Sequence, residues 1–102
     1  MMEAEPTAPA VVILSRAASL LDSVGADRTK VDAEVALKCL FAAALLESAG
    51  GRAARVPLLH GDPRTTIRAA MTALSELDEA VFSREPVLGA ARTARRALRL
   101  LD

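Results

Sequence analysis

The sequence predicts an all-α protein, most simply a four-helix antiparallel bundle that self-association can complete. Ala and Leu, which both favour helices, dominate a chain of 102 residues that is 52% hydrophobic and only 2% aromatic. Apolar residues recur at helical spacing, and Gly and Pro interrupt that spacing where helices are expected to end. No segment reads as a convincing strand. We expect residues 1–8 to form a disordered tail and residues 9–102 a single helical domain.

The first half of the chain predicts two helices. Pro9 suits the first turn of a helix, and Gly25 suits its C-terminal cap. The apolar side of this helix comprises Ile13, Leu14, Ala17, Leu20, Leu21 and Val24. Thr29, with Asp32 three residues later, resembles a capping arrangement for a second helix, which Gly50–Gly51 should end.

The second half predicts two further helices, after the 13-residue break "GGRAARVPLLHGD". Asp62 is a good N-cap, and Pro63 suits the first position of the third helix. Its apolar face is expected to comprise Ile67, Ala70, Met71, Leu74, Leu77 and Val81. Glu85 can cap, and Pro86 can open, a fourth helix that runs to Leu101.

The stretch "VALKCLFAAALL", residues 35–46, is apolar on two opposite sides. Eleven of its twelve residues are apolar, and Lys38 is the only charge. At 100° per residue, a first arc holds Leu37, Leu40, Phe41 and Leu45, and a second, opposite arc holds Val35, Cys39 and Leu46. A single bundle core needs only one broad apolar face. We expect the first arc to face the chain's own core.

The second arc has two interpretations. We expect Val35, Cys39 and Leu46 to meet a helical partner protein or a second copy across a two-fold axis, in a homo-oligomer that is most simply a dimer. Burying three such side chains would contribute a few kcal/mol, at roughly 1.5–3 kcal/mol each. The alternative is that loop residues of the same chain cover this arc, namely Val56, Leu58 and Leu59.

Four arginines share one side of the predicted C-terminal helix. Arg92, Arg95, Arg96 and Arg99 fall within about 100° of arc, with no acid among them. Residues 86–102 carry four bases and one acid, whereas residues 1–51 carry four bases and seven acids. The plain interpretation is a solvated surface that complements the helix dipole. The alternatives are a charged partner face for an acidic protein, a nucleic-acid backbone or a membrane surface.

The composition points to no enzyme and no cofactor. Cys39 is the only cysteine, so no internal disulfide is possible, which fits a reducing cytoplasm. His60 is the only histidine, and with Cys39 it supplies at most two metal ligands at a spacing that fits no zinc motif. The acidic N-terminal segment and the lack of an apolar run of about 18 residues predict a cytoplasmic protein without a membrane span.

Arg55 and His60 have the spacing R-x4-H, which resembles the catalytic motif of HEPN-type ribonucleases, an all-helical family. The resemblance covers six residues and implies His60 as acid–base and Arg55 as phosphate ligand. In that family the pair lies on a helix, whereas here Pro57 separates the two residues within a Gly-bounded loop. We therefore do not assign this activity.

The sequence favours a non-enzymatic, helical protein–protein interaction or oligomerisation module, such as a small adaptor or regulatory subunit, that acts through its second helix. A first alternative is a nucleic-acid-binding regulator that uses the Arg-rich C-terminal helix. A second alternative is a carrier of a small apolar ligand in an under-filled, Ala-rich core.

Overall fold

The computed structural model describes residues 8–54 and 61–102, and within them the regular structure is entirely helical. It contains α1 (Ala8–Ala26), α2 (Ala33–Ser48), α3 (Pro63–Leu74), α4 (Glu79–Phe82) and α5 (Glu85–Leu101). The all-α class is therefore confirmed, with five helices in place of the four that were predicted. The predicted tail before Ala8 and the covering loop residues Val56, Leu58 and Leu59 lie outside the described residues.

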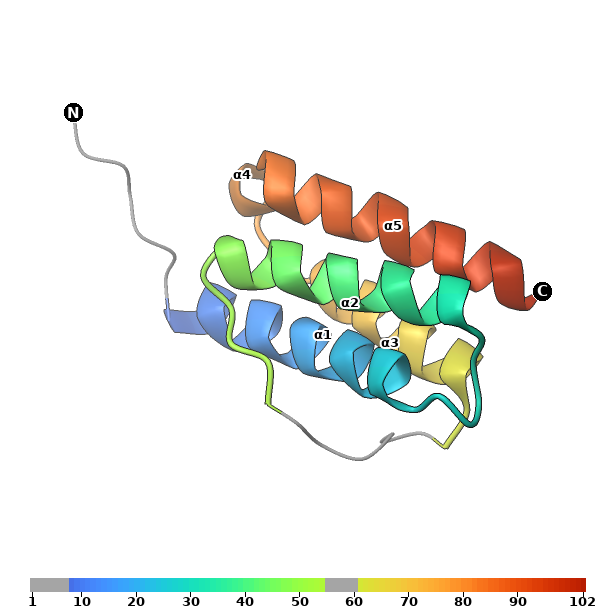
Figure 1. Ribbon diagram of the computed structural model, residues 1–102. Coiled ribbons are helices and arrows are strands. Elements are labelled where there is room, and N and C mark those ends of the chain that lie inside the picture. The colour runs from blue at the N-terminus through green and yellow to red at the C-terminus, as the bar shows by residue number, and fades with distance from the viewer. Residues whose placement is uncertain (1–7, 55–60) are drawn as a thin grey trace.

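The four long helices pack side by side (Figure 1). α2 lies between α1 and α5, and α3 contacts both α1 and α5 from behind. In Figure 1, α1 and α5 run in one direction and α2 and α3 in the other.

Aspartate caps fix the starts of two helices. The Val35 amide donates to the Asp32 carboxylate over 3.1 Å, so Asp32 is the N-cap of α2. The Thr65 amide donates to the Asp62 carboxylate over 3.0 Å, with Pro63 at the start of α3 as predicted. The cap that was predicted at Thr29 is wrong, because its amide and hydroxyl donate to Asp27 two residues earlier.

The third helix is shorter than its apolar spacing predicted. α3 ends at Leu74, and the amides of Glu76 and Leu77 then bond three residues back, which tightens the last turn. This turn buries the Leu77 side chain and leaves Asp78 exposed, in a non-helical conformation, before the single-turn α4. The predicted continuous face through Val81 is therefore broken, and Asp78 does not lie among core side chains.

The core is aliphatic and rich in alanine. Its largest fully buried side chains are Leu14, Leu21, Leu46, Ile67 and Leu74. Two glycines let neighbouring segments approach closely. A Cβ on Gly51 would lie 2.9 Å from the Leu14 carbonyl carbon, and one on Gly25 would lie 2.5 Å from Leu40 Cγ. Glycine at these contacts lets α2 and the segment after it lie close to α1 and leaves little room for larger side chains.

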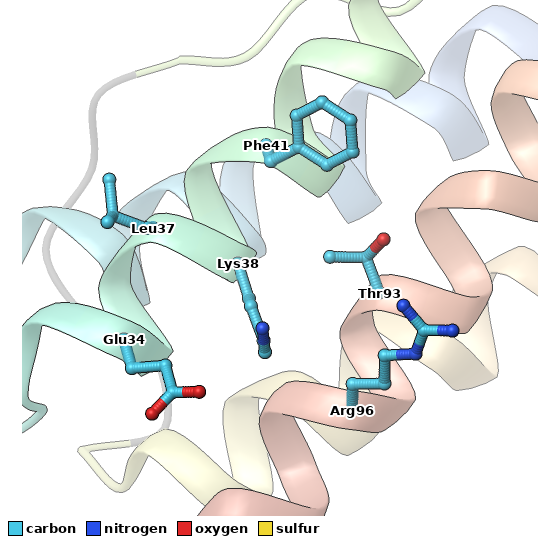
Figure 2. A pocket seen from close by; sticks show the side chains of 6 residues that line it. All are labelled: Glu34, Leu37, Lys38, Phe41, Thr93 and Arg96. Atoms are coloured by element: carbon cyan, nitrogen blue, oxygen red, sulfur yellow. The ribbon is translucent and has the colours of Figure 1, made fainter.

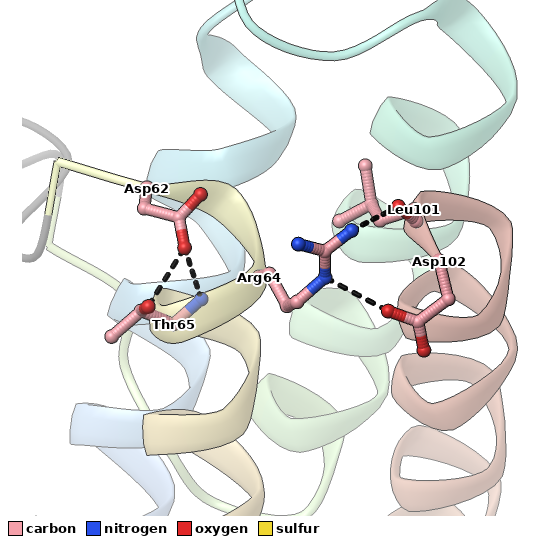
Figure 3. Close-up of polar contacts among 5 residues, drawn as sticks. All are labelled: Asp62, Arg64, Thr65, Leu101 and Asp102. Carbon is pink, nitrogen blue, oxygen red and sulfur yellow. Dashed lines mark hydrogen bonds and ion pairs between the residues drawn. The ribbon is translucent and has the colours of Figure 1, made fainter.

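An ion pair joins the start of α3 to the end of α5 (Figure 3). Arg64 Nε lies 2.8 Å from Asp102 Oδ1, and the same guanidinium donates to the Leu101 carbonyl. A cation beside the last carbonyls of a helix is favourable because those groups lack intrahelical partners. Both side chains are more than a third exposed, so the pair contributes at most about 1 kcal/mol.

Among the described residues, α1 is long and apolar enough on average to cross a membrane, and this single weak candidate is consistent with the expectation of no membrane span. Its apolar run is interrupted by polar residues, namely Ser15, Arg16, Ser19 and Asp22. The average hydropathy of the helix nevertheless stays high enough for it to count as a candidate span. Half of the apolar window in α1 is buried inside the fold. A core helix of a globular protein passes the same test, so α1 is weak evidence for a membrane span.

Candidate protein-interaction surface

The two apolar arcs of α2 are oriented opposite to the prediction. Val35, Cys39 and Leu46, which were predicted to form an interface, are at most 2% exposed and belong to the chain's own core. Leu37 and Phe41, which were predicted to be buried, are 67% and 58% exposed. We call Leu37, Leu40 and Phe41 the α2 outer face.

Packing explains why the second arc is the buried one. The same side of α2 carries small residues that are also buried, namely Ala36, Ala42 and Ala43. These alanines let α2 approach α1 and α5 at short distance, so medium-sized side chains such as Val35 and Cys39 fill the remaining space. Leu46 is also fully buried on this side, whereas Leu37 and Phe41, on the opposite side of α2, remain exposed.

Two residues of the first arc are held at the edges of α2. Leu40 lies over Gly25 near the end of α1 and stays 38% exposed. Leu45 approaches Gly89 of α5, where an added Cβ would lie 3.2 Å from Leu45 Cδ1. The first arc therefore spans the whole width of α2 between its two neighbours, and the α2 outer face is its solvent-exposed part.

A groove adjoins the α2 outer face on the side of α5 (Figure 2). Its volume is about 360 Å³, and its lining residues are Glu34, Leu37, Lys38, Phe41, Thr93 and Arg96. Leu37 and Phe41 supply its apolar part, and Thr93 lies across from them on α5. Charged groups border the apolar part, with Lys38 and Arg96 basic and Glu34 acidic.

The predicted arginine side of α5 is exposed along its length. Arg92, Arg95, Arg96 and Arg99, which we call the Arg face, all have exposed side chains. The opposite side of α5 carries Val87, Ala90, Ala94 and Ala97, which are buried. Arg96 is the member of the Arg face that also lines the groove, so the apolar and basic surfaces adjoin at this residue.

Of the side chains considered for catalysis or metal binding, Cys39 lies among the described residues. Cys39 is fully buried, and burial raises the pKa of its thiol to about 12, so the thiolate form is disfavoured. Within residues 8–54 and 61–102, no group of three His, Cys, Asp or Glu side chains could hold a metal ion. Arg55 and His60, which carry the R-x4-H spacing, lie outside the described residues.

No protein-family model, curated protein or solved structure compared with this chain matches it. The candidate surface therefore rests on the chain's own geometry. Sequence reasoning identified the Arg face and the unusual apolarity of α2, but it missed Thr93 and Glu34 as groove residues. A usable signal was present, because Glu34 falls on the same arc as Phe41 and Leu45 and marks that arc as solvent-facing.

Proposed function

We propose that this chain is a non-enzymatic, helical protein–protein interaction module that binds through the α2 outer face. In this proposal the four long helices act as one antiparallel bundle, and the partner covers the side of α2 that the bundle leaves open. The partner is a second copy or a helix of another protein.

The observation that carries the proposal is the exposure of large apolar side chains on one helix face. Leu37, Leu40 and Phe41 lie within two turns, and the chain has only two phenylalanines. Exposed apolar residues that occur singly are ordinary on protein surfaces, but adjacent ones beside a groove are typical of interaction sites. Phe is also among the residue types enriched in the centres of interfaces.

Site-specific photo-crosslinking tests the proposal. Phe41 is replaced by benzoylphenylalanine, which keeps a large aromatic side chain on the α2 outer face. We expect irradiation, of the purified protein or in cells that express it, to give a defined adduct that is either a covalent dimer or a complex with another protein. Val12 of α1 provides the matched control, because it is also apolar and 56% exposed.

The control defines the contrary result. If position 41 gives no adduct, or gives the same diffuse adducts as position 12, the α2 outer face is an ordinary exposed surface. A defined adduct from position 41 alone supports the proposal, and mass spectrometry of that adduct identifies whether the partner is a second copy.

A nucleic-acid-binding regulator is the second candidate function. The observation that favours it is the continuous exposure of the Arg face, whose four side chains occupy two turns of α5. Basic residues along one helix can follow a phosphate backbone, and such binding weakens steeply with salt. Neither the Arg face nor the groove presents an aromatic stacking platform beyond Phe41, so we place this function second. The carrier of a small apolar ligand stays a prediction.

A further inference from the structure

We infer that the occupant of the α2 outer face and groove is an amphipathic helix of another protein that carries carboxylates along one flank. This inference rests on the proposed function and names the class of partner that the surface fits. It depends on three features of the surface. These are the size of its apolar part, the positive charge on the side of α5, and the poor fit of a second copy.

The apolar part has the dimensions that suit a helix. Leu37 and Phe41 lie one turn apart on α2, and Leu40 lies beside them toward α1. The groove of about 360 Å³ next to them can take one or two side chains but not a whole helix. A helix laid along α2 would therefore insert a ridge of apolar side chains beside Phe41, as ridges enter grooves in ordinary helix packing.

The charge next to this apolar part is predominantly positive on one side. Lys38 and Arg96 line the groove, and Arg92, Arg95 and Arg99 continue the basic surface along α5. Glu34 is the acid that lines the groove, and Asp102 pairs with Arg64 of α3. The exposed acids Glu47 and Glu85 lie near the end of α2 and at the start of α5, away from the groove-lining part of each helix. A partner helix with carboxylates toward α5 would complement this surface, whereas a basic helix would be repelled.

A second copy fits the same surface poorly. If two copies paired their α2 outer faces with the helices antiparallel, the two-fold axis would place both α5 helices on the same side of the interface. The two Arg faces would then repel each other. If the helices were parallel, each Arg face would lie toward α1 of the other copy, which carries only one acid and one base, Asp22 and Arg16. Neither arrangement supplies an excess of carboxylates, because the acids on α2 and α5 of the other copy, Glu34, Glu47 and Glu85, are accompanied by its own Lys38 and Arg face.

Binding of two designed peptides tests the inference. Both are helical and have Leu at positions i, i+4, i+7 and i+11, and the remaining surface positions are rich in Glu in one peptide and in Lys in its twin. We expect the Glu peptide to bind the full chain at least tenfold more tightly than the Lys twin at low salt, measured by fluorescence anisotropy. We also expect its affinity to fall as salt screens the charges.

Matched variants connect the binding to the surface. Phe41→Ser should weaken binding of the Glu peptide at least tenfold, and Val12→Ser should leave it unchanged. Arg96→Gln should weaken it several-fold and reduce its salt dependence, whereas Arg68→Gln, which changes an exposed arginine on α3, should do neither. Circular dichroism of each variant confirms that the helices remain formed.

Four results overturn the inference. The first is that the Lys twin binds as tightly as the Glu peptide, and the second is that Arg96→Gln does not change binding of the Glu peptide. The third is that the parent is a dimer and that Phe41→Ser dissociates it. The fourth is that an oligonucleotide binds more tightly than the Glu peptide and that Phe41→Ser does not change its affinity. The first three leave the proposed function standing if Phe41 is still required. If neither peptide nor self-association depends on Phe41, and position 41 gives no crosslink, the proposed function fails as well.

Discussion

The Cys39 thiol illustrates how burial controls the chemistry of a single residue. Its side chain is fully buried, and burial raises its pKa to about 12. Because the thiolate is the reactive form, we expect the folded protein to resist a maleimide reagent near neutral pH and to react only after denaturant is added. Mass spectrometry follows the modification.

A relocated cysteine controls for reagent access. In a Cys39→Ala, Phe41→Cys variant the only thiol lies on the α2 outer face, and we expect it to react at once in the folded protein. If the parent reacts as fast as this variant, Cys39 is not protected and α2 is turned differently from the structure described.

Acidic substitutions on the two arcs of α2 should have opposite effects. Cys39→Asp places a charge among buried apolar groups, at a cost of several kcal/mol against a typical total stability of about 5–15 kcal/mol, so we expect unfolding. Phe41→Glu replaces an exposed side chain with a good helix former, and we expect a change of less than about 1 kcal/mol. Circular dichroism and thermal melting measure both, and a folded Cys39→Asp variant would contradict the assignment of the arcs.

At the scale of elements, the Asp62 cap makes the stability of α3 dependent on pH. The Thr65 hydroxyl donates to the Asp62 carboxylate over 2.7 Å, and this bond, with the Thr65 amide, lowers the pKa of Asp62 below its ordinary value of 3.8. A lowered folded pKa stabilises the protein above the unfolded pKa, and this stabilisation is lost as pH falls through the folded pKa.

Asp62→Asn tests this linkage. Asn also caps helices but does not titrate, so we expect the variant to lose part of the drop in melting temperature that the parent shows when the pH falls below 3.8. Melting curves from neutral to acid pH measure it. Parallel curves for the parent and the variant would show that Asp62 contributes nothing to the acid sensitivity.

Close contacts between elements predict unequal tolerance of alanine at two glycines. In Gly51→Ala the new Cβ would lie 2.9 Å from the Leu14 carbonyl carbon, a backbone atom that cannot move alone, so we expect a loss of about 1–3 kcal/mol. In Gly89→Ala the obstacle is the end of the Leu45 side chain at 3.2 Å, and the gain in helix propensity of about 1 kcal/mol offsets the crowding. Denaturant unfolding should rank Gly51→Ala below Gly89→Ala, and the reverse order would exclude this packing.

Local sequence signals predicted where helices start or stop at capping and helix-breaking residues better than they predicted how long each helix is. The Asp62–Pro63 start and the Gly50–Gly51 end were readable because caps and breakers act through residues next to each other in the chain. The end of α3 at Leu74 was not readable, because apolar spacing continues to Val81 and only the burial of Leu77 in a tightened turn interrupts it. That burial depends on neighbours distant in sequence.

At the scale of the whole molecule, the orientation of α2 was the part that the sequence pattern left undecided. A helical wheel shows two apolar arcs but does not say which of them the other helices cover. In the structure the buried side is the one that also carries Ala36, Ala42 and Ala43, which permit close packing against α1 and α5 beside Cys39. The Arg face was predictable because its opposite side on α5 is uniformly apolar, so only one orientation buries no charge.

The basic residues of the Arg face are clustered on α5, and this clustering, not the net charge of the chain, should determine how the protein binds a polyanion. The chain has a formal net charge of zero, so any retention on heparin must come from a local basic surface. Replacing Arg95, Arg96 and Arg99 by Gln removes most of the Arg face. Because these side chains are exposed and the Arg95–Arg99 pair repels at i,i+4, we expect the melting temperature to stay the same or rise slightly.

A second triple variant holds the net charge equal. Arg28, Arg52 and Arg68 are also exposed but are dispersed over other segments, and replacing them by Gln lowers the net charge by the same three units. We expect the Arg-face variant to elute from heparin at lower salt than the dispersed variant, because closely spaced guanidinium groups act together on a polyanion. Equal elution of the two variants would mean that α5 presents a solvated surface without a cooperative basic site, and a partner helix would then have to be held by the α2 outer face alone.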